Sequence, residues 1–195
     1  MRATELVETN DLVLRHLSGD PRAFPEIVGR YEDRLLRFTT RVIGDRARAE
    51  DLVQETFLRV SRHLHRFDTS RNFATWVYTI VSNLTRNEIR SRQRSPLVFF
   101  ESARVATDDD RGPMQFADHR SRPDFMLANR DLADLVERTM ARLPAIYRDV
   151  LVLREIEGRS YDEMCMILDC GMGALKSRLH RARLNFVALI TPHLD

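Results

Sequence analysis

The sequence predicts an all-α protein made of two small helical domains joined by a flexible linker. Apolar side chains recur at steps of three and four residues along most of the chain, and no pair of alternating segments suggests strands. The segment 96–128 is different, because it combines prolines, an acidic triplet and no sustained period. With 195 residues and 43% hydrophobic side chains, the chain can form two small cores. We therefore expect domains over 1–95 and 129–195.

The first domain is expected to begin with a short helix near 11–17 and a longer second helix. Asp20-Pro21 is typical of a helix cap followed by a first-turn proline, so we expect the second helix to start there. Gly44 and Asp45 interrupt the apolar period and predict its end. Its inward positions are Phe24, Ile27, Val28, Tyr31, Leu35, Phe38 and Val42.

Two further helices complete the predicted bundle. The third runs to about Leu64, the polar stretch 68–72 forms a loop, and the fourth helix occupies 73–94. Trp76 falls on the apolar side of the fourth helix, where core packing is its expected role. The inward positions of both helices are Ala49, Leu52, Val53, Phe57, Val60, Leu64, Phe73, Trp76, Val77, Ile80 and Leu84.

The second domain opens with a helical period that returns at Leu132 and continues through Pro144 to Ile156. Its pattern then changes to that of a helix-turn-helix unit. A short helix over 161–168 leads through a glycine-bearing turn over 169–171 into a longer basic helix. At the start of the short helix, Ser160 and Glu163 have the spacing of a capping box. The apolar stripe of the longer helix is Met172, Leu175, Leu179, Ala182 and Phe186.

The opposite side of this last helix predicts contact with DNA. An α-helix fits the major groove, where Lys and Arg meet the acceptor atoms of guanine and Ser can serve several bases. An ordinary solvated basic face is the alternative, but no acidic residue lies between Met172 and Phe186, and solvated faces normally mix charges. The residues of the predicted face are Lys176, Ser177, His180 and Arg181, with Arg178 on its shoulder.

Other functional classes have little support. The six histidines are scattered and no nucleophile–base set or phosphate loop is present, so we expect no enzymatic activity and no cofactor. Cys165 is expected in the helix core and Cys170 in the turn, where their spacing does not suggest a metal site and their burial disfavours a redox role. No apolar run is long enough to cross a bilayer and no signal peptide is apparent, so a cytoplasmic protein is expected.

Three segments resemble regions of bacterial sigma factors and occur in the order typical of that family. Residues 49–59 resemble region 2.2, residues 73–83 resemble regions 2.3 and 2.4, and the segments 143–154, 158–161 and 176–183 resemble region 4. Because the resemblance covers domains two and four alone, the sequence is similar to extracytoplasmic-function (ECF) sigma factors of the sigma-70 family. It implies a sigma2-like bundle, a sigma4-like helix-turn-helix domain and a protein that directs RNA polymerase to promoters.

The resemblance implies contact with core RNA polymerase. In such proteins the region 2.2 helix docks on the β′ clamp helices, and region 4 contacts the β flap. An exposed leucine beside carboxylates suits a partner surface, with a merely solvated face as the alternative. The expected docking residues are Asp51, Gln54, Glu55 and Leu58.

The resemblance also implies two surfaces that read promoter DNA. Region 2 melts the −10 element and holds extruded bases, which Asn and Arg side chains can bond or stack against. The expected −10 residues are Asp68, Thr69, Ser70, Arg71 and Asn72 in the loop, and Asn83, Arg86, Asn87 and Arg90 on the fourth helix. The expected −35 residues are Lys176, Ser177, Arg178, His180 and Arg181, with Arg154 on the preceding helix.

Two alternatives to a working sigma factor stay open. A decoy that titrates an anti-sigma factor could lose its DNA-reading side chains, yet both reading faces are retained here. A plain helix-turn-helix repressor would leave the region 2 resemblance unexplained. A cognate anti-sigma factor is implied by the resemblance alone. The acidic linker either occupies a channel built for nucleic acid or serves as a solvated tether.

Overall fold

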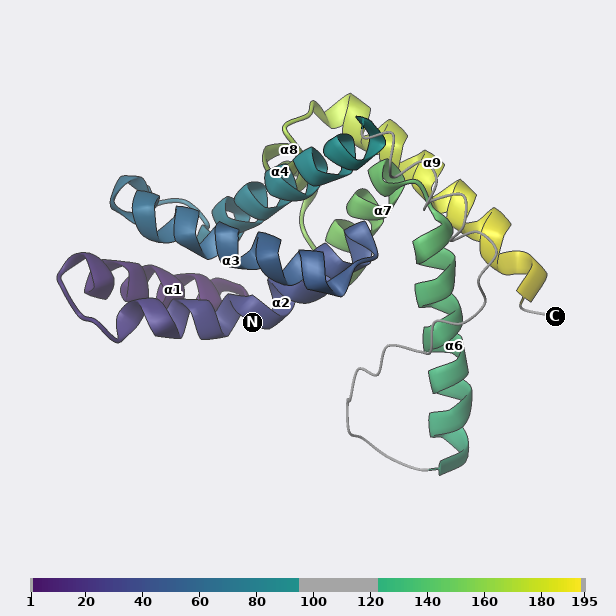
Figure 1. Ribbon diagram of the computed structural model, residues 1–195, viewed down its shortest axis with the longest axis horizontal. Helices are drawn as coiled ribbons and strands as arrows, with labels where there is room; N and C mark the ends of the chain where they lie inside the picture. Colours follow the sequence, from purple (N-terminus) through teal and green to yellow (C-terminus); the bar gives the residue numbers. More distant parts are fainter. Residues whose placement is uncertain (1, 95–122, 194–195) are drawn as a thin grey trace.

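The computed structural model describes residues 2–94 and 123–193, with side-chain surroundings for 8–94 and 131–193 (Figure 1). Every regular element in these ranges is helical, which confirms the all-α prediction for the described residues. Most of the predicted linker, including its acidic triplet, lies outside them.

Four helices form the N-terminal bundle. α2 lies at its centre, because it packs against each of the other three helices. A 3₁₀ turn, η1, follows the third helix. The bounds are α1 (Arg2–Leu17), α2 (Ala23–Ile43), α3 (Arg46–His63), η1 (Leu64–Arg66) and α4 (Phe73–Arg94).

Two helix starts differ from the sequence prediction. α1 begins well before residue 11, and its buried Thr9 lies 3.3 Å from the Tyr31 hydroxyl, a polar pair that an apolar period does not reveal. α2 begins after Pro21, because Asp20 closes a turn and does not act as the N-cap. Its carboxylate accepts hydrogen bonds from the Arg22 amide at 2.9 Å and from the Arg15 guanidinium at 2.6 Å.

The end of α2 follows the prediction. Gly44 has a left-handed φ of 73°, and its amide donates to the Thr40 carbonyl at 2.8 Å. Asp45 then accepts a hydrogen bond from the Arg48 amide at 3.0 Å, as the N-cap of α3. A glycine that stops one helix and an aspartate that starts the next therefore make this reversal tight.

Aromatic side chains fill the centre of the bundle. Tyr31, Phe73 and Tyr78 are almost fully buried. Trp76 is half-buried, and its ring centroid lies 5.0 Å from that of Phe67 and 5.7 Å from that of Phe73. These distances are those of favourable aromatic pairs, so the core role expected for Trp76 is confirmed.

In the C-terminal part, α6 and α7 pack against α9 of the helix-turn-helix unit, and the far end of α6 extends away from the rest of the molecule (Figure 1). α6 begins at a first-turn proline, so its first residues overlap the predicted linker. The helix does not continue through Pro144, which lacks an amide hydrogen and starts a new helix. The bounds are α6 (Pro123–Arg142), α7 (Ala145–Leu151), the π-helical turn η2 (Val152–Ile156), α8 (Tyr161–Leu168), α9 (Met172–Ile190) and the 3₁₀ turn η3 (Thr191–His193).

The N-terminal and C-terminal helices pack against each other, which the sequence did not predict. α8 lies along α4, while α6, α7 and η2 contact α2 (Figure 1). Buried apolar side chains from both parts belong to one continuous cluster. The two groups of helices therefore share a core, and residues on α4 and α2 face the helix-turn-helix unit.

Candidate nucleic-acid interface

The helix-turn-helix unit is built as the sequence predicts. Ser160 Oγ accepts from the Glu163 amide at 3.2 Å, and the Glu163 carboxylate accepts from the Ser160 amide at 2.8 Å. These reciprocal bonds form a capping box at the start of α8. Asp169 takes a left-handed φ of 49° at the end of α8, and Gly171 is the N-cap of α9. On α9 the inward side chains Leu175, Leu179 and Ala182 are buried.

The outward face of α9 carries the predicted DNA-reading side chains. Lys176, Ser177, His180 and Arg181 are all exposed, whereas Arg178 is half-buried. Two turns of helix thus present cationic and hydroxyl donors to solvent, while the opposite stripe is buried. This is the arrangement that a recognition helix needs to enter a major groove.

The half-buried position of Arg178 brings its charge close to a buried carboxyl group. Asp149, on α7, is 4% exposed, and its Oδ1 has no hydrogen-bond partner within the described residues. Burial raises the pKa of Asp149 to about 7, and the positive charge of Arg178 opposes that rise. Arg178 therefore acts on the interior of the domain as well as on the surface beside the predicted DNA contacts.

Arg154 is held beside the start of α8. Its guanidinium donates to the Arg159 carbonyl at 2.8 Å and lies over the Tyr161 ring, 4.7 Å from the ring centroid. The cation–π contact and the hydrogen bond fix the side chain in one position. The structure thus places this predicted DNA contact on η2, outside α9 itself.

The predicted −10 loop is ordered by its own side chains. Asp68 Oδ1 accepts from the Ser70 amide at 3.0 Å and from its hydroxyl at 2.6 Å, and these bonds lower the pKa of Asp68. Arg71 pairs with the same carboxylate at 3.3 Å, and the Thr69 carbonyl accepts from α1. Asn72 Oδ1 caps α4 by accepting from the Ala74 amide at 2.8 Å. The exposed members of the loop are Asp68, Ser70 and Arg71.

The polar stripe of α4 borders α8. Asn83, Asn87 and Arg90 are exposed, but Arg86 is half-buried. The Arg86 guanidinium donates to the Leu168 carbonyl at 2.6 Å and to the Ile167 carbonyl at 3.2 Å. It thereby satisfies free carbonyls at the C-terminal end of α8, where a positive charge also complements the helix dipole. Arg86, a predicted −10 residue, is thus occupied by the helix-turn-helix unit.

A buried polar cluster joins the two groups of helices. The Tyr78 hydroxyl donates to Glu157 Oε2 at 2.6 Å, and the Arg34 guanidinium lies 3.7 Å from the same carboxylate. The Arg159 guanidinium lies over the Tyr78 ring, 4.3 Å from its centroid. The Glu157 side chain is only 7% exposed. Burial and then the Glu157 charge raise the pKa of Tyr78, so the hydroxyl stays a donor.

Two further residues bridge the same interface. Glu163, besides its part in the capping box, accepts from Asn72 Nδ2 and Thr75 Oγ1, both at 3.3 Å. Arg148, on α7, donates to the Val42 carbonyl at the end of α2 at 3.0 Å and to the Leu143 carbonyl at 2.7 Å. Sequence reasoning assigned none of these cross-domain contacts. The capping box was the one local signal that marked a member of this interface.

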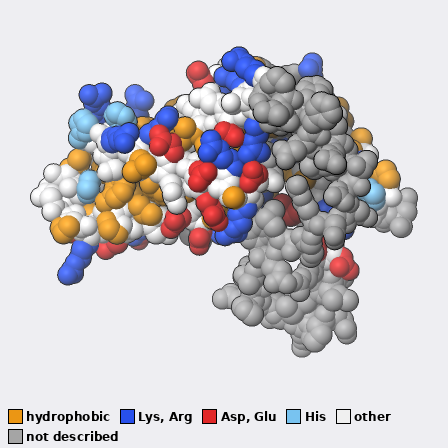
Figure 2. Space-filling view, in the orientation of Figure 1, with side chains coloured by type: hydrophobic (Ala, Val, Ile, Leu, Met, Phe, Trp, Pro, Cys, Tyr) orange, Lys and Arg blue, Asp and Glu red, His pale blue; other side chains and the backbone are white. Residues whose placement is uncertain are grey.

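The outward face of α3 is mixed in character. Asp51 and Gln54 are exposed, Glu55 is half-buried, and Leu58 is 52% exposed. Asp51 pairs with Arg48 at 3.2 Å and Glu55 with Arg59 at 2.7 Å. Figure 2 shows acidic and basic side chains intermixed over the middle of this side of the molecule. The predicted docking residues thus form one solvent-facing stripe that contains an exposed leucine.

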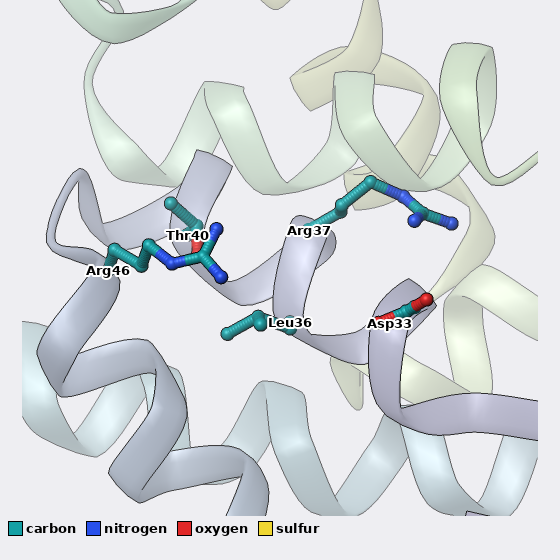
Figure 3. A pocket seen from close by; sticks show the side chains of 5 residues that line it. All are labelled: Asp33, Leu36, Arg37, Thr40 and Arg46. Atoms are coloured by element: carbon teal, nitrogen blue, oxygen red, sulfur yellow. The ribbon is translucent and has the colours of Figure 1, made fainter. Parts of the chain in front are cut away.

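A pocket of about 130 Å³ lies between α2 and the start of α3, well below the ~300–1,000 Å³ of ordinary ligand sites. Its lining residues are Asp33, Leu36, Arg37, Thr40 and Arg46, and Arg46 points toward Thr40 (Figure 3). Across the described ranges, no group of three His, Cys, Asp or Glu side chains could hold a metal ion. None of the helices in those ranges is long and apolar enough to span a membrane.

Comparisons with known proteins give matches along most of the chain. A model of Sigma-70 region 2 matches residues 27–95, and a model of Sigma-70, region 4 matches residues 133–185. The chain is 32% identical over 165 residues to the ECF RNA polymerase sigma factor SigW of Bacillus subtilis, covering 85% of this chain and 87% of that protein. It is 33% identical over 178 residues to the RNA polymerase sigma-H factor of Pseudomonas aeruginosa, covering 90% of each.

Among solved structures, the chain resembles CnrH in complex with the cytosolic domain of CnrY. The TM-score is 0.64 at 26% identity, and the match covers 94% of this chain and 97% of CnrH. The likeness therefore extends over both groups of helices.

Proposed function

The chain belongs to the sigma-70 family as an ECF sigma factor, and from this premise we propose that it directs core RNA polymerase to promoters through two DNA-reading surfaces. The observation that carries the proposal is the exposed basic face of α9, set on a well-formed helix-turn-helix unit. In this function the protein binds and positions other molecules, and it catalyses no reaction of its own.

We assign −35 recognition to α9. Lys176 and Arg181 are suited to guanine acceptors in the major groove, while Ser177 and His180 can meet several bases or phosphates. We assign Arg178 to the edge of the DNA contact, because its positive charge also interacts with the buried Asp149 carboxyl group. Arg154, held by Tyr161, is suited to a phosphate beside the groove.

We assign −10 recognition and melting to the loop 68–72 and the polar stripe of α4. Asn83, Asn87 and Arg90 are exposed and lie on one face, where they can hydrogen-bond or stack with extruded bases. Arg86 belongs to this stripe but caps α8 in the present arrangement. Promoter DNA can therefore reach Arg86 only after α4 and α8 separate, which makes domain separation part of the proposed function.

We assign the stripe Asp51, Gln54, Glu55 and Leu58 to the β′ clamp helices, and the helix-turn-helix domain to the β flap. Leu58 supplies apolar surface and the carboxylates supply charge, the mixture that protein interfaces of this kind use. We also propose that the protein acts in the cytoplasm, because this is where it would meet RNA polymerase.

A protein inhibitor is a further proposed partner. CnrH, which this chain resembles over 94% of its length, was solved with the cytosolic domain of CnrY bound to it. We infer that this chain likewise has a cognate anti-sigma factor. A decoy function is the second candidate, and it shares this partner but requires no promoter contact. A simple repressor would need the α9 domain alone.

Run-off transcription with purified core polymerase tests the proposal. The full chain is added to core enzyme on a promoter library, and the transcripts are sequenced to find shared −10 and −35 elements. Arg181→Ala is expected to lower specific initiation about tenfold and to relax the −35 preference, as expected for a lost base contact. Asn83→Ala is expected to impair opening at the −10 element.

Arg183→Ala is the matched control, because it removes one positive charge from α9 at a residue that pairs with Glu155 at 2.7 Å. It should change initiation little and leave the −35 preference intact. Core binding without any initiation would favour the decoy, and tight duplex binding without core binding would favour the repressor.

A further inference from the structure

The turn of the helix-turn-helix unit holds the two cysteines of the chain side by side. Asp169, in the left-handed conformation, ends α8, and the Cys170 amide donates to the Cys165 carbonyl at 3.1 Å. This is the six-residue hydrogen bond of a Schellman motif, in which the residues at its two ends bring their side chains into contact. In most such motifs that contact is apolar. Here the residues at the two ends of the motif are Cys165 and Cys170, so the contact is between two thiol side chains.

Both cysteines are accessible enough to react. Each is half-buried and free, contrary to the burial expected for Cys165 from the sequence. The Cys165 side chain packs against the edge of the core and stays partly exposed. Burial, Cys170 and the Asp162 carboxylate raise the pKa of the Cys165 thiol, so Cys165 rests as a thiol.

We propose that Cys165 and Cys170 form a reversible disulfide when the protein meets a peroxide, and that this bond weakens recognition of the −35 element by α9. One thiol gives up its proton, and the resulting thiolate attacks a peroxide oxygen. This breaks the O–O bond and gives a sulfenic acid and hydroxide, which takes up the proton and leaves as water. The second thiol attacks the sulfenic sulfur, an S–S bond forms, and water leaves. In total two thiols are oxidised and hydrogen peroxide is reduced to two molecules of water.

The position of the bond gives it a consequence for DNA binding, a step that rests on the proposed function. A disulfide holds its sulfur atoms about 2.05 Å apart, closer than two unbonded sulfur atoms can lie, so the last turn of α8 and Cys170 must approach each other. Cys170 directly precedes Gly171, the N-cap of α9. Lys176 and Ser177 lie in the next turns, so a shift at this cap changes how they meet the groove.

A site with two thiols and no further metal ligand is better suited to forming a disulfide than to binding a metal ion. Structural zinc sites need four ligands, and no third metal-binding side chain joins the pair among the residues described. Cytosolic disulfides, where they occur, are mostly transient and redox-sensing.

The test treats the reduced full chain with hydrogen peroxide, removes the oxidant with catalase, alkylates with iodoacetamide and measures the intact mass. The expected product is a monomer that has lost two hydrogen atoms and takes up no alkyl group. Because the chain has two cysteines, that product identifies the bond. In run-off transcription with core polymerase, the oxidised protein should initiate about tenfold less, comparable with the loss of one good base contact. Dithiothreitol should restore initiation.

Cys165→Ala and Cys170→Ala are the controls, and both variants should stay active and be insensitive to peroxide. Over-oxidised monomers or intermolecular dimers in place of the internal bond would overturn the proposal, as would an internal bond that leaves initiation unchanged. If the reduced protein fails to initiate at all, the proposed sigma function is wrong, whereas the mass measurement still decides whether the disulfide forms.

Discussion

Arginine side chains make many of the polar contacts in this protein, and two of them cap helices across the domain interface. Arg86 reaches from α4 to the last carbonyls of α8, and Arg148 reaches from α7 to the last carbonyls of α2. A guanidinium presents several donors in a fixed plane, so one side chain can serve two or more carbonyls at once. The pKa of Arg148 is lowered by its burial, which shows how far this cap is removed from water.

The buried Asp149 carboxyl should make stability depend on pH. Its pKa is about 7 in the folded chain, above the ordinary value of 3.8. Below pH 4 the carboxyl is protonated in both states and has no effect on the free energy of unfolding. As the pH rises to 7 the unfolded chain ionises first, so the buried carboxyl lowers the free energy of unfolding increasingly. We expect Asp149→Asn to raise the free energy of unfolding above pH 7 by up to about 4 kcal/mol, with the gain disappearing near pH 4. Urea unfolding at several pH values measures this.

Asp162→Asn, at an exposed carboxylate of α8, is the matched control and should show no such trend. An equal effect of Asp149→Asn at pH 5 and pH 8 would mean that the Asp149 carboxyl does not titrate as described.

The exposed Leu58 side chain should contribute strongly to the affinity for core polymerase, because binding would bury it. Burying a half-exposed leucine side chain is worth about 1–2 kcal/mol, so Leu58→Ala should weaken core polymerase binding about tenfold. Leu14→Ala is a matched control, since Leu14 on α1 is 54% exposed and Leu58 is 52% exposed. Fluorescence anisotropy of the labelled chain with core enzyme measures both, and equal losses would argue against a specific α3 contact.

Among the elements, α8 depends most on its ends. It has eight residues, which is too short for a helix to be stable alone, so its capping box and its packing on α4 must hold it. Ser160→Ala removes one of the reciprocal bonds and should lower the free energy of unfolding by about 1 kcal/mol. Thermal unfolding followed by circular dichroism measures the change.

Ser91→Ala, at an exposed site on α4, provides the comparison and should change stability by less than about 0.5 kcal/mol. A similar small effect at Ser160 would show that tertiary packing, and not the cap, maintains α8.

Glu157 should help to hold the N-terminal and C-terminal groups of helices together. Hydrogen bonds to charged groups are worth about 1.5–3 kcal/mol, so Glu157→Ala should shift the molecule toward separated domains. Small-angle X-ray scattering should then give a larger radius of gyration for the variant. Promoter-directed initiation should not fall, because DNA binding requires this separation.

Glu155→Ala is the matched control, since Glu155 pairs with Arg183 inside the helix-turn-helix domain. Unchanged scattering for Glu157→Ala would show that apolar packing between α4 and α8 suffices to keep the domains together.

Local signals in the sequence predict most of the helices, their inward faces and the helix-turn-helix unit. These features are local, since an apolar period, a capping box at Ser160 and a glycine stop at Gly44 act within a few residues of the chain. The same is true of the exposed face of α9. Where local polar bonds replaced apolar contacts, as at Thr9 and Asp20, the predicted helix starts were wrong.

How the two groups of helices meet became clear from the tertiary structure alone. Tyr78 and Glu157 are far apart in the sequence, and no period or spacing links a hydroxyl on one helix to a carboxylate beside another. Arg86 likewise has the pattern of a solvent-facing DNA contact, yet its guanidinium caps α8. Local patterns show which side of a helix faces water or core, but the partner across an interface is set by packing between distant segments.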